Sequence, residues 1–342
     1  MARRPTINDV ARQAGVSVAT VDRVLNNRRP VRVDTARRVV AAAEATGYHA
    51  AGLLRRRAED FAPAKSLGFL LQKESKPFYR QLATALEAAT RAHGAIRGEP
   101  VIRFVDELSP SAIVDALGRL GHEVDAACIV SIDHPLVADE IARQAEAGIP
   151  VLSLLSRLPD TSTAAHIGIE GRRAGRTAAW ALARCAAGPG PLGVLIGSNR
   201  YVSHEDREIG FRTYFREHFP DFRILESIVY LDDSAVSYGA TRDLLARNED
   251  LVGLYLIGGG VDGALRALTE DGPQRHLAFV CHELTPRSRQ GLIDGMVDMV
   301  IASPTERLAE RAVDRLVGAI LKPDGPVEDA IVPFEIYISE TV

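Results

Sequence analysis

The chain is poor in the residues that staple small secreted proteins together or bind zinc. Its 342 residues include three cysteines, Cys128, Cys185 and Cys281, which are far apart and lie in apolar runs. An odd number of widely separated cysteines argues against a disulfide framework and against the paired spacing of a zinc site. We therefore expect all three to be small side chains of a hydrophobic core, with no metal bound.

Long hydrophobic runs are also absent. No stretch of about 18 apolar residues occurs, and no apolar segment follows the basic residues of MARRPTINDV, so the sequence predicts neither a transmembrane helix nor a signal peptide. We expect a cytoplasmic protein with no membrane partner. With 46% hydrophobic residues, the chain is long enough to bury a large core in two or three domains.

Lysine is missing from the first 60 residues, which hold 12 arginines against 6 acidic residues, a balance of +6. The rest of the chain has a balance of −10, within a net charge of −4. A compact basic segment on an acidic body predicts a polyanionic partner for that segment alone.

Three short helices are predicted in residues 1–48. Thr6 is suited to cap a first helix that ends near Gly15, Ser17 to cap a second, and Asp34 to cap a third. Two helices joined by a tight glycine turn, with a third beside them, predict a helix-turn-helix, whose second helix enters the major groove of DNA. A helical bundle that merely joins domains is the alternative, but the basic balance and the turn spacing favour DNA binding.

The second predicted helix offers an exposed face to DNA. Arg23 is suited to bind a guanine through two hydrogen bonds, and Val18 and Ala19 to contact thymine methyl groups. The hydroxyls of Ser17 and Thr20 are placed for phosphates.

This segment resembles a known family. PTINDVARQAGVSVATVDRVLN, followed by VRVDTARRVVAAAEATGYHAAGLLRRR, is similar over about the first 57 residues to the headpiece of the lactose-repressor (LacI/GalR) family of bacterial transcription regulators. The resemblance implies base contacts from Val18, Ala19 and Arg23. It implies DNA backbone contacts from Thr6, Ser17, Thr20, Asn26 and Thr35. Asp22 departs from the family, which usually has serine there.

The family also has a hinge helix after the headpiece, expected here within residues 49–63. Its leucine enters the minor groove at the operator centre. A gapless match places Arg57 at that position. Either Leu53 or Leu54 takes this role through a shift in register, or Arg57 reads the groove electrostatically.

In residues 64–342, short apolar runs alternate with helical stretches. The runs predicted as buried strands are LGFLL, VIRFV, AACIV, VLSLL, LGVLI, LVGLYLI and LAFVC. Helices are predicted over residues 78–93, 137–148, 172–186 and 305–321. This alternation predicts an α/β fold with doubly wound parallel sheets and ligand sites at the carboxyl ends of the strands. The body is too long for one sheet, so we expect two similar lobes.

The body resembles the periplasmic sugar-binding fold that this regulator family carries, especially its ribose-type branch. The resemblance implies one lobe at about residues 66–166 with 300–322 and another at about 167–299 with 326–340. Strands that cross between the lobes would form a hinge.

The resemblance also implies a small effector, a sugar, polyol or sugar acid, in the cleft between the lobes. Phe78 and Tyr79 suit the apolar face of a sugar ring, although ordinary core aromatics remain the alternative. Glu205 stands where the family commonly has an arginine, and Leu155 where it has an aspartate, so the ligand differs from ribose and galactosides. The expected ligand contacts are Lys76, Phe78, Tyr79, Asp133, Arg157, Glu205, Gly259, His282 and Glu283.

One segment suggests a different function. GGGVDG, residues 258–263, matches the glycine pattern of a dinucleotide-binding turn, with Glu283 about 20 residues further on. An NAD-dependent enzyme is therefore the alternative, although the turn lies late in the body instead of in its first unit. The favoured interpretation is a homodimeric, ligand-controlled repressor that needs no cofactor and catalyses no reaction.

Overall fold

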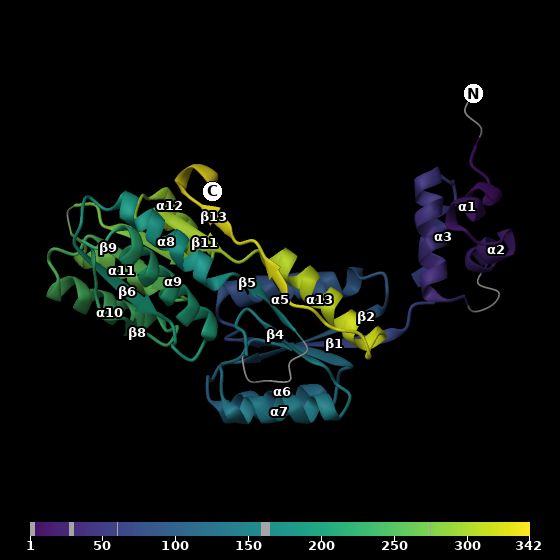
Figure 1. Ribbon diagram of the computed structural model, residues 1–342, viewed down its shortest axis with the longest axis horizontal. Helices are drawn as coiled ribbons and strands as arrows, with labels where there is room; N and C mark the ends of the chain where they lie inside the picture. The colour runs from purple at the N-terminus through teal and green to yellow at the C-terminus, as the bar shows by residue number, and fades with distance from the viewer. Residues whose placement is uncertain (1–3, 27–30, 60, 159–164, 274) are drawn as a thin grey trace. The chain divides into compact units, whose positions relative to one another are not determined.

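The structure is a computed structural model that describes residues 4–26, 31–59, 61–158, 165–273 and 275–342. It contains two compact units, residues 1–66 with 90–100 and residues 67–89 with 101–342. Figure 1 labels the helices and strands of both.

The N-terminal part of the chain, called the head below, consists of four short helices: α1 (Ile7–Ala14), α2 (Val18–Asn26), α3 (Val33–Thr46) and α4 (Ala51–Glu59). Their apolar stripes meet in one small core. The buried residues of this core are Val10, Ala11, Ala14, Val21, Val24, Ala36, Val39, Ala42, Ala43, Tyr48 and Leu54. The helix-turn-helix expected from the sequence is thus joined by a fourth packed helix.

Local sequence explains the helix ends. The backbone N–H of Thr6 donates to Asp9 at 2.9 Å, and Gly15 ends α1 with a φ of 62°, a conformation that glycine adopts without strain. The Ser17 hydroxyl accepts from the Thr20 N–H at 3.2 Å, so Ser17 caps α2 as predicted. The prediction that Asp34 caps α3 is wrong. Arg32 is the extended residue before that helix, and Asp34 lies within the first turn, where its charge favours the helix dipole.

The body contains two sheets. The first has the strand order β12-β5-β4-β3-β1-β2 and the second the order β13-β11-β10-β9-β6-β7, with β8 also paired to β6. The first sheet comprises β1 (Ala64–Gln72), β2 (Arg97–Val105), β3 (Ala126–Ile129), β4 (Val151–Leu154), β5 (His166–Ile169) and β12 (Ala330–Val332). The second comprises β6 (Pro191–Ile196), β7 (Arg223–Ile224), β8 (Ile228–Val229), β9 (Gly253–Ile257), β10 (Ala278–His282), β11 (Met299–Ala302) and β13 (Glu335–Tyr337).

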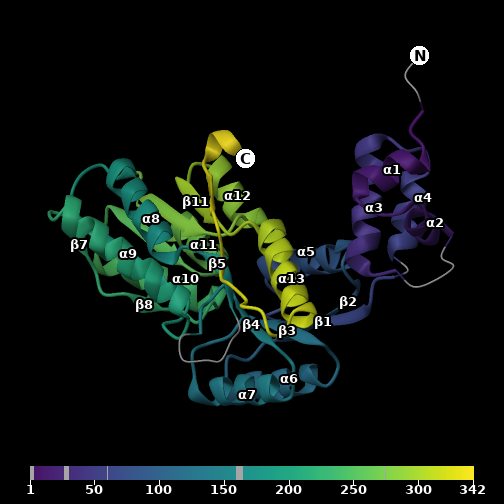
Figure 2. The same ribbon diagram turned by 45° about the vertical axis from the view of Figure 1, so that its right-hand side comes forward.

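Helices cover both sheets. Those of the first lobe are α5 (Pro77–Ala92), α6 (Pro110–Gly121), α7 (Pro135–Glu146) and α13 (Thr305–Leu321). Figures 1 and 2 show α6 and α7 on one face of the first sheet and α13 on the other. Those of the second lobe are α8 (Gly171–Cys185), α9 (Val202–His218), α10 (Ser234–Arg247), α11 (Val261–Asp271) and α12 (Pro286–Ile293). A short helical turn at Ser339–Thr341 follows β13.

The expected strands and helices of the body form, and the fold class is confirmed. The prediction that VIRFV is a buried strand is wrong in one respect, because β2 lies at the edge of its sheet and only Val105 of that run is buried. The lobe boundaries need correction, because β11 pairs in the second sheet and β12 in the first, the reverse of the expected assignment. The chain therefore crosses between lobes after β5, after β11 and after β12. Strand pairing decides these points, and short crossing strands carry little sequence pattern of their own.

The structure also bears on two expectations drawn from composition, the buried cysteines and the lack of a transmembrane helix. Cys128 and Cys281 are buried, but Cys185 is exposed, because it lies at the last residue of α8; the prediction of a core position for it is wrong. None of the helices within the described ranges is long and apolar enough to span a membrane.

Candidate functional site

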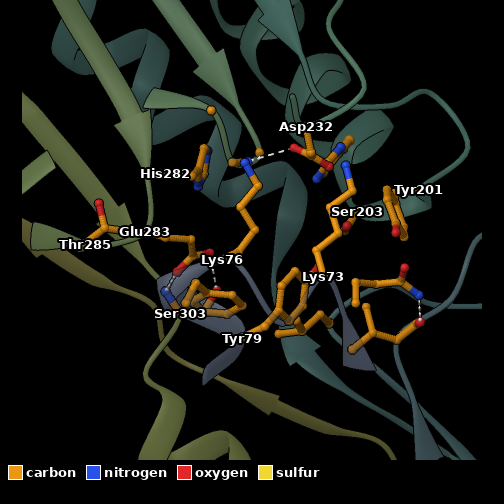
Figure 3. A pocket seen from close by; sticks show the side chains of 18 of the residues that line it. Lys73, Lys76, Tyr79, Tyr201, Ser203, Asp232, His282, Glu283, Thr285 and Ser303 are labelled. Atoms are coloured by element: carbon orange, nitrogen blue, oxygen red, sulfur yellow. Dashed lines mark hydrogen bonds between the residues drawn. The ribbon is translucent and has the colours of Figure 1, made fainter. Parts of the chain in front are cut away.

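A cavity of about 100 Å³ opens at the carboxyl ends of the strands, the usual place for a ligand in parallel sheets. The loop after β1 and the start of α5 line it from the first lobe. The loops after β9 and β10, together with α9, line it from the second lobe. Figure 3 shows Lys73 and Lys76 extending from the first lobe toward Asp232 of the second.

The cavity gathers buried polar atoms that lack hydrogen-bond partners. In the part of the chain that the structure describes, three such side-chain atoms occur: Gln72 Oε1, Arg207 Nε and His282 Nδ1. All three residues line this cavity. A buried polar atom without a partner costs about 1–3 kcal/mol, and such atoms are rare in native proteins. Their convergence at one place indicates that a polar ligand completes the site.

Arg207 is the most unusual of these residues. It is 6% exposed, and its Nε–H has no partner among the described residues. The nearest acid is Glu283, whose Oε1 lies 3.8 Å from Arg207 Nη2, beyond hydrogen-bond distance. A guanidinium carries five N–H donors, so a ligand with several acceptor oxygens suits this position.

Glu283 is held rigidly opposite Arg207. Its Oε2 accepts from the Ser303 backbone N–H at 2.8 Å, and its Oε1 accepts from the Ser303 hydroxyl at 2.8 Å. Its backbone φ is 66°, a strained value for a residue with a side chain. Burial raises the pKa of the Glu283 carboxyl, although Arg207 and Ser303 act against that shift.

Asp232 faces the lysines of the first lobe. Its Oδ1 accepts from the Gly259 N–H at 2.8 Å, and burial raises its pKa while Gly259, Lys73 and Lys76 oppose the rise. Lys73 Nζ donates to the backbone carbonyl of Leu231 at 2.9 Å, a hydrogen bond between the lobes. Leu231 and Asp232 both have positive φ, 54° and 50°, so this loop stores strain at the cleft.

Two histidines at the cavity are neutral. Burial, with Arg207 nearby, lowers the pKa of His204 to about 3 and holds that of His282 well below its ordinary value. His204 Nδ1 accepts from the Ser198 N–H at 3.2 Å, and His282 Nε2 lies 2.7 Å from the Tyr255 hydroxyl. Both rings therefore serve as hydrogen-bonding groups and not as charges.

Aromatic side chains supply the apolar part of the wall. The rings of Phe78 and Tyr79 meet edge to face, with centroids 5.3 Å apart. Tyr201 packs beside His204 at 5.1 Å. All four residues line the cavity, and such surfaces suit the apolar face of a small ring.

Six residues predicted as ligand contacts lie around this cavity: Lys76, Phe78, Tyr79, Gly259, His282 and Glu283. Three others lie elsewhere, so their prediction is corrected. Asp133 is exposed, and its backbone N–H donates to the backbone carbonyl of Arg200. Arg157 is paired with Asp329, and Glu205 is exposed on α9.

Sequence reasoning chose Glu205 and missed Arg207 in the segment HEDREIGF. Helical spacing explains the error. His204, Arg207 and Phe211 are buried on one face of α9, three and four residues apart, whereas Glu205 is rotated by about 100° from His204. The spacing of the apolar Phe211 from Arg207 was the signal that marked the inward face.

The glycines of residues 258–263 have structural roles. Gly258 and Gly260 have φ values of 103° and 113°, and a Cβ on Gly263 would lie 2.0 Å from the Ser234 carbonyl oxygen. The Gly259 N–H, which a nucleotide phosphate would need, already donates to Asp232. A carboxylate in this position repels a pyrophosphate, so the site does not favour the dinucleotide alternative.

The head presents the expected face of α2. Ser17, Val18, Ala19 and Arg23 are exposed, and Thr20 is half-buried. The Asn26 side-chain amide donates to Asp22 at 2.7 Å, so the departure at Asp22 engages a predicted DNA contact. Thr6 and Thr35 are half-buried. Contact of these residues with DNA stays a prediction.

The two leucines of α4 differ sharply. Leu54 is 0% exposed in the core of the head, whereas Leu53 is 41% exposed. The prediction that Leu54 contacts the minor groove is therefore wrong, because its side chain packs against α2 and α3 in the core of the head. Leu53 and the exposed Arg57 remain candidates.

Comparison with known proteins agrees with this architecture. The family model "Bacterial regulatory proteins, lacI family" matches residues 6–50, and the model "Periplasmic binding protein domain" matches residues 67–322.

Among curated relatives, a Streptomyces limosus protein named "Uncharacterized HTH-type transcriptional regulator in aml 5'region" is 30% identical over 212 residues, 60% of this chain and 57% of that protein. The ribose operon repressor of Bacillus subtilis is 39% identical over 93 residues, 26% of this chain and 27% of that protein. The chain thus spans little more than half the length of the first relative and about a quarter of the second.

Among solved structures, a solute-binding protein from Burkholderia graminis in complex with D-arabinose has a TM-score of 0.74 at 21% identity, over 82% of this chain and 96% of that chain. A periplasmic solute-binding protein from Actinobacillus succinogenes with bound D-allose has a TM-score of 0.74 at 17% identity, over 81% of this chain and 98% of that chain. These likenesses show the fold of the body. With the four-helix head and the two-lobed body, the matches place this chain in the lacI family of bacterial regulatory proteins, with a periplasmic binding protein domain as its body.

Proposed function

We propose that this protein is a transcriptional repressor whose affinity for operator DNA is controlled by a small, neutral, polyhydroxylated ligand in the cleft. It acts as a homodimer in the cytoplasm and catalyses no reaction. Two heads bind the halves of a palindromic operator, and the ligand changes the angle between the lobes.

The buried guanidinium of Arg207, with its unpartnered Nε–H, is the observation that carries the ligand site. Leaving such a group buried is unfavourable without a ligand. A sugar hydroxyl both donates and accepts, so it can satisfy Arg207 as a donor and Gln72 Oε1 as an acceptor.

The charges around the cavity favour a neutral ligand. Lys73, Lys76 and Arg207 carry positive charge, and they are matched in number by the acidic residues Asp232, Asp262 and Glu283. Neutral histidines do not change this balance. Sugar acids, which the sequence left open, would meet Asp232 and Glu283 as well as the cations, whereas hydroxyl groups suit both signs.

A melting-temperature screen of the purified full chain tests this function. The panel contains neutral sugars and polyols (D-arabinose, D-allose, D-ribose, D-tagatose, ribitol), sugar acids (D-gluconate, D-glucuronate) and NAD. A neutral member at 100 times its Kd stabilises the protein by about 2.7 kcal/mol. Arg207→Met abolishes that stabilisation, whereas Arg216→Met, an exposed arginine on the same helix, leaves it unchanged. Stabilisation by NAD alone, or by sugar acids alone, contradicts the proposal.

The DNA part is tested separately. Wild-type protein is used to select duplexes from a random library, and the selected sequences are expected to be palindromic and bound by a dimer in analytical ultracentrifugation. Adding the stabilising sugar is expected to release them. A failure to select any duplex over random DNA refutes the regulator function even if a sugar binds.

A further inference from the structure

The turn between α1 and α2 has carbonyl groups that the first helix cannot satisfy by itself. The last four carbonyls of a helix lack partners within the helix. At the end of α1, the Gly15 N–H donates to the Arg12 carbonyl at 3.2 Å and the Val16 N–H to the Ala11 carbonyl at 3.0 Å. The carbonyls of Ala14 and Gly15, in the turn itself, need hydrogen-bond donors from elsewhere.

Arg38 of α3 supplies those partners from 23 and 24 residues away. Its Nε donates to the Ala14 carbonyl at 3.1 Å, and its Nη2 donates to the same oxygen at 2.5 Å. Nη2 also donates to the Gly15 carbonyl at 3.1 Å. The planar fork of a guanidinium suits such a double contact, and its charge is favourable at the C-terminal end of a helix.

The glycine of the turn is fitted to this contact. A Cβ on Gly15 would lie 3.0 Å from Arg38 Nη2, closer than ordinary van der Waals contact. The small residue therefore serves both the positive φ of the turn and the close approach of the guanidinium. The neighbouring residues Ala36 and Val39 are buried in the head core, which anchors the part of α3 that carries Arg38.

This placement differs from the one expected of an arginine in a basic DNA-binding head. An arginine in a DNA-binding domain is ordinarily a phosphate contact. Nε and Nη2 of the exposed Arg38 instead donate to the carbonyls of the turn that leads into α2 at Val18. Arg37, the next residue, is also exposed and has no side-chain hydrogen bond within the described residues, so it is a matched control.

We propose that Arg38 is a positioning residue. By binding the carbonyls of the turn between α1 and α2, it fixes the angle of α2 to α3, and it contacts no phosphate. The inference rests on the proposed function in one respect, that α2 is the helix that reads DNA. Loss of Arg38 frees the turn carbonyls and lets α2 change its angle to α3, so specific recognition suffers more than general attraction to DNA.

Full-length Arg38→Met, Arg38→Lys and Arg37→Met proteins are compared with wild type. Hydrogen exchange of the amides of residues 15–21, without DNA, is expected to speed up about tenfold or more in Arg38→Met, which corresponds to about 1.4 kcal/mol. Arg37→Met leaves it unchanged. Arg38→Lys restores part of the protection, because an ammonium can donate to one carbonyl but cannot form the fork.

Specific and non-specific DNA binding are measured separately, because a general loss of structure would weaken both, whereas a change in the position of α2 weakens chiefly the specific binding. Affinity for the tightest duplex selected by wild type is expected to fall about tenfold or more in Arg38→Met. The salt dependence of binding to random-sequence duplex stays unchanged, because no phosphate contact is lost. If Arg38→Met prevents folding, the partly retained amide protection of Arg38→Lys tests the proposal instead.

Two results overturn the inference. One is unchanged hydrogen exchange in Arg38→Met. The other is a salt slope that falls by about one, the signature of a lost phosphate contact. If wild type selects no duplex, the proposed function fails, and the exchange comparison still decides whether Arg38 holds the turn.

Discussion

Replacing Leu54 by alanine is expected to loosen the whole DNA-binding head. Leu54 is 0% exposed among α2, α3 and α4. Truncation of a fully buried leucine costs about 2–5 kcal/mol. The cost is large for a core of this size, because small domains bury little surface and have little stability to spare. Leu53 is the matched control, since it lies on the same helix but is 41% exposed. A surface substitution of this kind changes stability by about 0.5 kcal/mol or less.

The assay is hydrogen exchange of the full chain in the absence of DNA, followed at the slowest amides of α1 to α4. A loss of 2 kcal/mol corresponds to exchange about 30-fold faster. Leu54→Ala is expected to reach at least this acceleration throughout the head, and Leu53→Ala to leave exchange within about threefold of wild type. Equal effects of the two substitutions, or none from either, would show that α4 is not docked on the head and would refute this account of the hinge segment.

Three further predictions concern DNA reading, the ligand and pH. Arg23→Ala is expected to weaken specific binding by about 1–3 kcal/mol and to relax the base preference; unchanged selectivity in a footprinting titration removes Arg23 from base reading. Phe78→Ala is expected to abolish sugar-induced release of the selected duplex while sparing DNA binding, because Phe78 lines the cavity of the body; a normal sugar response removes Phe78 from the site. Burial lowers the pKa of His166 to about 4 and that of His204 to about 3, below the ordinary value of about 6.5. Protons therefore bind these histidines in the unfolded chain first, so their contribution to the free energy of unfolding is greatest above pH 6.5 and falls by about 1.4 kcal/mol per pH unit per histidine as the pH drops toward 4. Denaturant titrations of His204→Gln and wild type at pH 7 and 5 check this, and an equal acid loss in both contradicts it for His204.

Most of what the sequence specified is local. The capping of α1 by Thr6, the αL glycine at Gly15 and the cap at Ser17 involve residues within a few positions of one another. The buried strands of the body show as apolar runs for the same reason, because a strand buried on both faces needs no partner in the sequence to reveal it. The helix-turn-helix and the α/β alternation of the body follow from such short-range patterns. The two lobes followed from the length of the body and from the resemblance to the periplasmic sugar-binding fold, which also implied the aromatic cavity residues Phe78 and Tyr79.

Other features depend on partners far away in the chain. Arg38 donates to carbonyls of the turn that lie more than 20 residues earlier in the chain. Arg207 lines the cavity because it lies on the buried face of α9, which packs on the second sheet. Leu54 and Leu53 are neighbours of the same type, and only the position of α4 against α2 and α3 makes one a core residue and the other a surface residue. The sequence by itself determined which segments become helices and strands, because that choice is made by short-range periodicity and caps. Tertiary structure alone decided which side chains meet, since burial and hydrogen bonding at a site arise from segments that approach each other only after the chain has folded.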